Sequence, residues 1–277
     1  MRIDAHQHYW KVSRGDYGWM SPDMTVLYRD YQPADLEPLL KANGIDRTVV
    51  VQAAPTVAET EYLLDLADRH ESIAKVVGWL DMESDDFAKE LDRLARRPKF
   101  AGIRPMIQDL PDDAWMLRPA VLKNLAVLAD RGFTFDFLIH PRHLDYALEV
   151  VRRVPGLRCV VDHIAKPDIK RGVLDPWRDG IARLAEHPNV YCKLSGMVTE
   201  ADHDKWTSDD LRPFARHAVA CFGYERIMFG SDWPVCLLAA TYDQVVAACR
   251  DILADDLTPE REKAVFGGNA ARFYGIE

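Results

Sequence analysis

From one end to the other, the chain alternates between short apolar runs and longer segments with a helical period. Most of the short runs are hydrophobic throughout, as in Thr48–Val51, which is typical of parallel strands covered on both faces. Eight runs are predicted to be strands: Arg2–Ala5, Thr48–Gln52, Lys75–Leu80, Ala101–Met106, Thr134–Ile139, Arg158–Asp162, Val190–Leu194 and Ile227–Gly230.

Each strand is followed by a segment in which apolar residues recur every three or four positions. The predicted helices are Ala34–Asn43, Ala58–Glu71, Asp85–Arg96, Arg118–Arg131, Arg142–Arg153, Trp177–Glu186, Lys205–Cys221 and Tyr242–Leu253. Eight such units predict an α/β fold, a (β/α)₈ TIM barrel, with residues 1–277 forming one domain. An open doubly wound sheet is the alternative. It is disfavoured because no G-x-G-x-x-G turn follows the first strand.

Composition excludes several classes of protein. The net charge of −9 argues against a nucleic-acid partner, which needs a basic surface. The five cysteines have no C-x-x-C pair, so we expect reduced thiols rather than a disulfide framework or a cysteine zinc site. The first residues contain no apolar leader, and no apolar run is long enough for a membrane helix. We therefore expect a cytoplasmic enzyme without a membrane partner, and a homo-oligomer is compatible with the sequence.

The carboxyl ends of barrel strands are where catalytic side chains lie. The first strand runs into His6-Gln7-His8, and alternate residues of an extended segment point to the same side. Asp232 follows the last strand, which closes the barrel beside the first. We therefore predict that His6, His8 and Asp232 bind a metal ion, and that Asp232 also accepts a proton from water. Solvated histidines and a helix-capping aspartate are the alternatives.

Other strand ends supply further candidates. His163 could act as a ligand, an acid or an electrophile, and the preceding Asp162 could instead point outward and brace the barrel. Arg104 could hold an oxyanion. Asp136, His140, Lys193 and Ser195 are polar residues of later strands for which the sequence gives no definite role.

Substrate contacts are predicted from aromatic and polar residues near the same end. The long connection from Tyr9 to Gln32 contains Trp19 and is either a lid or substrate wall, or a satellite hydrophobic cluster. Trp19 and Trp233 are expected to pack on the substrate, and Gln52 and Lys166 to bind its polar groups.

Six segments of the chain, several of which contain these candidate residues, resemble a known protein family. They are Asp4–Trp10, Tyr17–Met20, Gly102–Arg104, Asp162–Pro167, Gly230–Pro234 and Gly268–Gly275. Together they resemble the amidohydrolase superfamily, in its amidohydrolase-2 type branch and the sugar-lactone hydrolase group that includes L-fuconolactonases and L-rhamnonolactonases. The resemblance covers the chain from first strand to last helix. It implies hydrolysis of an aldonolactone, with L-fuconolactone the first expectation, by water that Asp232 activates.

The resemblance also bears on the metal. Two-metal members of the superfamily use a carboxylated lysine on the fourth strand, where this chain has Arg104. We therefore expect at most one divalent ion, zinc if any, which activity does not necessarily require. Two alternatives stay open: a metal-dependent decarboxylase of an aromatic or enoic acid, and a barrel that binds a sugar acid without turnover.

Overall fold

The computed structural model describes residues 1–277 as a barrel of eight parallel strands in the order β1 to β8. The strands are β1 (Ile3–Gln7), β2 (Arg47–Val51), β3 (Ile73–Gly78), β4 (Phe100–Ile103), β5 (Thr134–Phe137), β6 (Arg158–Val161), β7 (Val190–Leu194) and β8 (Ile227–Phe229). The barrel closes just beyond β8, where Asp232 donates its backbone N–H to His6 and His8 donates to Trp233, at 2.8 and 2.7 Å. The predicted TIM barrel is confirmed.

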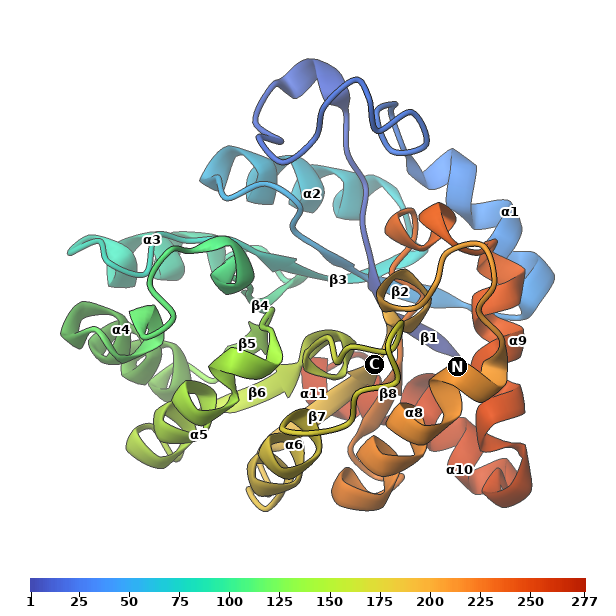
Figure 1. The fold of residues 1–277 in the computed structure, drawn as a ribbon. Coiled ribbons are helices and arrows are strands. Elements are labelled where there is room, and N and C mark those ends of the chain that lie inside the picture. The colour runs from blue at the N-terminus through green and yellow to red at the C-terminus, as the bar shows by residue number, and fades with distance from the viewer.

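Helices surround the strands (Figure 1). Those that follow β1 to β6 in turn are α1 (Pro33–Asn43), α2 (Val57–Arg69), α3 (Phe87–Leu94), α4 (Pro119–Asp130), α5 (Leu144–Arg153) and α6 (Trp177–Ala185). Then come α7 (Met197–Glu200), α8 (Ser208–Phe222), α9 (Tyr242–Leu253), α10 (Pro259–Lys263) and α11 (Asn269–Tyr274). All eight predicted helices are present, while α7, α10 and α11 were not predicted.

Several strands end earlier than their apolar runs. The predicted fourth strand extended to Met106 and the fifth to Ile139, but pairing stops at Ile103 and Phe137. The remaining residues leave the sheet at the barrel mouth, and Met106 lines a pocket there. Apolar side chains at these positions therefore belong to the mouth, which a hydrophobic pattern cannot distinguish from a strand.

Two hydrophobic cores stabilise the barrel. The larger lies between strands and helices, and the smaller lies inside the barrel. In the smaller core, Ile3, Ala5 and Val49 meet Ala270 and Phe273 of α11. Because the neighbouring Asn269 donates to the carbonyl of Ile227 at the start of β8, α11 covers the amino ends of the strands. The carboxyl ends remain available for a site.

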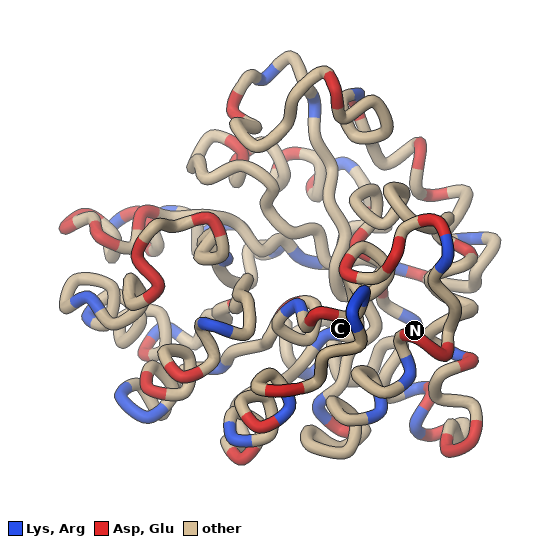
Figure 2. The backbone as a smooth tube through the Cα atoms, in the orientation of Figure 1, with Lys and Arg blue, Asp and Glu red and all other residues tan.

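Charged residues lie mainly on the outer helices, where both signs are interspersed (Figure 2). Ion pairs join neighbouring helices, such as Arg97 of the α3–β4 turn with Asp65 and Asp68 of α2, at 3.0 and 2.6 Å. The five cysteines are free. No helix combines the length and the apolar character that a membrane crossing requires.

Candidate active site

Barrel closure brings three predicted ligands together at the carboxyl ends of β1 and β8. His6 Nε2 and His8 Nε2 are 3.2 Å apart, and Asp232 Oδ1 lies 3.6 and 3.3 Å from them. The ring of His6 fits because the nearby residue is Gly230, where a Cβ atom would be 2.7 Å from the Cβ of His6. All three residues are buried, with exposed fractions of 4% or less.

The hydrogen bonding of His8 fixes which of its nitrogens faces the cluster. Its Nδ1–H donates to the carbonyl oxygen of Val51 at 2.7 Å, so Nε2 directs a lone pair toward Asp232. Two imidazole nitrogens and a carboxylate oxygen thus converge, and acceptors this close need a shared proton or a cation. The donor set is one that zinc prefers. The residues therefore fit a divalent metal ion.

A second set of potential ligand atoms shares His6 with the first. His6, Asp162 and His163 each offer a ligand atom within 4.8 Å of the others. Asp162 was predicted to point outward, and that prediction is wrong: the residue is fully buried, with Oδ1 3.4 Å from His6 Nδ1. β6 ends at Val161, so the sequence pattern alone did not fix the direction of the next side chain.

An unusual backbone positions His163. The four residues from His163 to Lys166 all have positive φ, between 48° and 60°. This conformation is disfavoured for L-residues, and such strain is concentrated at functional sites. The turn directs His163 Nδ1 to the Ser195 hydroxyl at 2.8 Å and leaves Nε2 3.9 Å from Asp232 Oδ1. Gly196 makes room, since a Cβ there would be 2.6 Å from the imidazole.

Arg104 lies beside the histidines, with Nη1 3.4 Å from His6 Nε2 and 3.5 Å from Asp162 Oδ2. Its Nη2 donates to the carbonyl of Gln52, and the Gln52 side-chain amide donates back to the carbonyl of Arg104. Arg104 Nε is buried without a hydrogen-bond partner. Gln52 was predicted to bind substrate, but its amide instead holds Arg104 in place and does not line the pocket.

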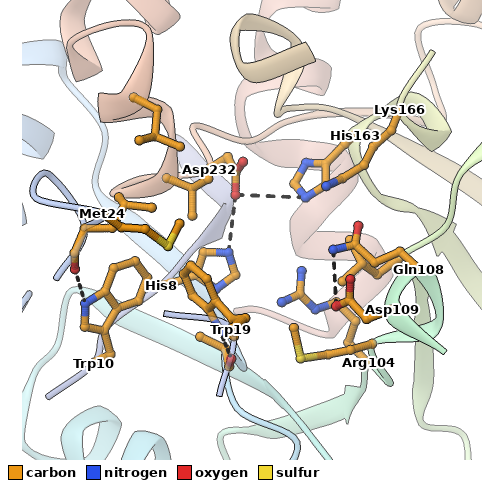
Figure 3. Close-up of a pocket in the computed structure, with 16 residues that line it drawn as sticks. His8, Trp10, Trp19, Met24, Arg104, Gln108, Asp109, His163, Lys166 and Asp232 are labelled. Atoms are coloured by element: carbon orange, nitrogen blue, oxygen red, sulfur yellow. Dashed lines mark hydrogen bonds and ion pairs between the residues drawn. The ribbon is translucent and has the colours of Figure 1, made fainter. Parts of the chain in front are cut away.

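A pocket of about 320 Å³ opens above these groups (Figure 3). His8, Arg104, His163, Lys166 and Asp232 form its polar part. The opposite wall comes from the long connection after β1, namely Trp10, Trp19, Met24 and Leu27. This connection is therefore a pocket wall, and its remaining aromatic residues pack behind it, as Tyr31 does against Trp10 with ring centroids 5.4 Å apart.

The two predicted tryptophans have different positions. Trp19 lines the pocket and donates its Nε1–H to the carbonyl of Ala53 at 2.7 Å. Trp233 does not line the pocket. It is 2% exposed and packs edge-on against Tyr31 and Tyr9, at 5.1 and 6.1 Å between centroids. The structure thus corrects its placement, because the chain turns after Asp232 and directs the indole into the packing around the barrel closure.

Sequence reasoning missed several residues of the pocket. Trp10, Met24, Gln108 and Asp109 line it, and the last two belong to a short 3₁₀ turn after β4. Nothing in the spacing of Met24, Gln108 and Asp109 along the sequence pointed to a site. The tryptophan of the His8-Tyr9-Trp10 segment had a signal, since it lies two residues beyond a predicted ligand. His140 does not line the pocket, and its ring stacks on that of His143.

The surroundings of the cluster favour an ionised Asp232 carboxylate together with neutral imidazoles of His6 and His163. Burial acts to raise the pKa of Asp232, but His163, His8 and Lys166 outweigh it and hold the pKa below its ordinary value. Burial, together with the charge of Lys193, holds the pKa of His6 well below its ordinary value. Burial also lowers the pKa of His163 well below the usual range. At neutral pH the cluster can accept a proton or bind a cation.

Comparison with known proteins agrees with this geometry. The chain is 46% identical to an L-fucono-1,5-lactonase of Burkholderia ambifaria, with 100% of this chain and 96% of the relative covered. It is 37% identical, with the same coverage, to an L-fucono-1,5-lactonase of Burkholderia multivorans. A crystal structure of a Burkholderia multivorans amidohydrolase with bound zinc superposes with a TM-score of 0.96 at 36% identity, covering 100% of both chains. Residues 3–276 match the family described as Amidohydrolase. The chain therefore belongs to the amidohydrolase family.

Proposed function

We propose that this protein is a lactonase that hydrolyses L-fucono-1,5-lactone to L-fuconate. The observation that carries the proposal is the convergence of Asp232, His8, His163 and Arg104 at the base of one pocket. Full-length similarity to two L-fucono-1,5-lactonases supports the choice of sugar. A barrel that binds without turnover would have these groups facing away from a shared cleft, whereas here they face into one.

Asp232 is proposed as the base that activates water. Its carboxylate is ionised at neutral pH, faces the pocket and has no arginine or lysine within ion-pair distance to tie up its oxygens. A water molecule between this carboxylate and the lactone carbonyl would lose its proton to Oδ2 or Oδ1 as it attacks the carbonyl carbon. The same proton can then pass to the ring oxygen as the ring carbon–oxygen bond breaks.

Arg104 and His163 are proposed to stabilise the tetrahedral intermediate. The guanidinium lines the pocket and is held by Gln52 at a fixed position, so it is organised to donate before the negative charge develops. Lys166 adds a second cation on the same side of the pocket. Trp19 and Met24 would cover the carbon face of the sugar ring and exclude solvent.

His6, His8 and Asp232 are proposed to hold one divalent ion, with zinc favoured by the nitrogen-rich donor set and by the zinc-bound relative. When bound, such an ion would polarise the carbonyl or lower the pKa of water. Because Arg104 supplies a fixed cation at the same place, the ion would add to a site that is already polarised.

Acid release from a panel of aldonolactones tests the proposal. With a pH indicator near pH 6.5, we expect L-fucono-1,5-lactone to react fastest, with weaker activity on lactones that differ in ring size or configuration. The panel is run with the metal-loaded protein and with protein treated with a chelator. Acid release from none of the lactones contradicts the lactonase proposal. Release of CO₂ from an aromatic acid would favour the decarboxylase alternative.

A further inference from the structure

A chain of buried charges extends below the active site through the inside of the barrel. The ammonium of Lys193 donates to Asp136 Oδ2 at 2.6 Å and lies 2.9 Å from Asp162 Oδ1. Its Nζ is also 3.2 Å from Nδ1 of His6. Tyr274 of α11 donates to the same oxygen of Asp136 at 2.8 Å. All of these side chains are buried, so water does not screen their charges.

Lys193 lies where its charge affects both potential sets of metal ligands. Its Nζ contacts Asp162 and His6, which are two of the three members of the set His6, Asp162 and His163. His6 is also a member of the set with His8 and Asp232. An ammonium in contact with two ligands of the second set contributes the positive charge that a second metal ion would otherwise supply.

Lys193 is the nearest cation to the carboxylate of the second set, with Nζ 2.9 Å from Asp162 Oδ1. Beside it, Asp136 Oδ1 is buried and accepts no hydrogen bond. Lys193 and Arg104 are the cations that face these carboxylates, and each contacts Asp162. Without Lys193, Asp162 would keep only Arg104 at 3.5 Å and Asp136 would have no cation beside it, and a buried unpaired carboxylate is strongly unfavourable.

We propose that Lys193 takes the electrostatic place of a second metal ion and thereby limits the site to a single, weakly held divalent ion. This inference rests on the metal site of the proposed function. It extends that proposal by assigning a determinant of metal number to a residue that does not line the pocket and contacts the first ligand set only through His6. Arg104 occupies the fourth-strand position where two-metal members have a metal ligand. Lys193 supplies the positive charge that a second metal ion would bring.

The test measures zinc binding to the intact protein. Wild type and Lys193→Met are freed of metal and equilibrated with zinc, and bound zinc is counted by elemental analysis while affinity is measured against a competing chromophoric chelator. We expect one zinc per wild-type chain. We expect Lys193→Met to bind a second zinc or to hold the first about tenfold more tightly, the size of effect that groups around metal ligands have on affinity.

Two further variants separate charge from packing. Lys166→Met removes a cation that lines the pocket but contacts neither Asp136 nor Asp162, so it should leave the number of zinc ions unchanged. The double variant Lys193→Met/Asp136→Asn removes one charge of each sign and should return zinc binding toward that of the wild type. The rise in melting temperature on adding zinc gives a second readout for a variant that is less stable than the wild type.

The inference is overturned if Lys193→Met binds the same amount of zinc with the same affinity as the wild type, or if the wild type itself binds two ions. Failure of both proteins to bind zinc overturns it together with the metal part of the proposed function. Lactone hydrolysis by chelator-treated protein is measured independently, so the lactonase proposal is judged separately.

Discussion

At the carboxyl ends of the strands, five non-glycine residues have positive φ, namely His163, Ile164, Ala165, Lys166 and Asp232. At the amino ends, α11 closes the barrel with Ala270, Phe273 and Tyr274, which pack on strand residues in a continuous apolar core. The carboxyl end also contains buried polar atoms without partners, such as Arg104 Nε. One end of the barrel therefore carries conformational strain and unpaired polar groups, while the other contributes stabilising burial.

The difference shows how one scaffold can hold an unfavourable cluster of charges in place. Residues in left-handed conformations cost about 1–2 kcal/mol each, and such conformations persist only where surrounding packing determines them. The apolar amino end and the helices supply that packing. Mutations at the two ends should accordingly separate into those that lower activity in a stable protein and those that lower stability in an active one.

The largest expected effect comes from Asp232→Asn at the carboxyl end. Asparagine preserves the shape but cannot accept the proton from water, so kcat/KM should fall by about 10²–10⁴-fold. The measurement is the lactone assay, with the melting temperature as a check on folding. Asp109→Asn, at the exposed rim of the same pocket, is the control and should keep most of the activity. Full activity in Asp232→Asn would contradict the proposed base.

At the amino end, Phe273→Ala should have the opposite profile. Phe273 is 2% exposed and contacts Tyr191 and Tyr274 with ring centroids 4.9 and 4.8 Å away. Its truncation should lower the free energy of unfolding by about 3–5 kcal/mol, measured by urea denaturation. The kcat/KM per folded molecule should stay within about twofold of the wild type. A large loss of activity in the folded fraction would show that the two ends are not separable.

Substitutions of Trp19 and Trp233 test the difference between loss of activity and loss of stability within the carboxyl end of the barrel. Trp19→Phe loses a hydrogen bond to Ala53 in the pocket wall, so KM should rise by about fivefold, equivalent to roughly 1 kcal/mol, with little change in melting temperature. Trp233→Phe should lower the melting temperature and leave KM unchanged, because Trp233 is packed away from the pocket. The reverse pattern would mean that Trp233 contacts the substrate.

The smallest effect is expected from pH. Asp232 acts as an ionised carboxylate, and its pKa is held below the ordinary value of 3.8. Activity is therefore complete above that pKa and is lost only as pH falls through it. Between pH 5 and 7, where spontaneous lactone hydrolysis is slow enough to subtract, kcat/KM should be nearly constant. An acid limb near pH 6 would instead indicate a histidine as the base.

Much of the site was predictable because strand ends and side-chain alternation are local properties. The pair His6 and His8, with Asp232 beyond the last strand, follows from the rule that barrel strands present functional groups at their carboxyl ends. Arg104 was found in the same way, Lys166 was found because it follows His163, and both line the pocket. Gln52 also ends a predicted strand and Trp233 follows Asp232, yet neither lines the pocket, so a position near the site does not fix the direction of a side chain.

The sequence by itself determined the eight-unit barrel and the placing of His6 and His8 on one side of the first strand's end, since each depends on patterns within about ten residues. Only the tertiary structure decided that Asp162 points inward to His6, that α11 fills the amino end, and that Lys193 and Asp136 meet below the active site. Asp162 and His6 are 156 positions apart, and Lys193 and Asp136 are 57 positions apart. The formation of these contacts depends on how neighbouring strands are aligned and on the turn after β6, which no local hydrophobic pattern encodes.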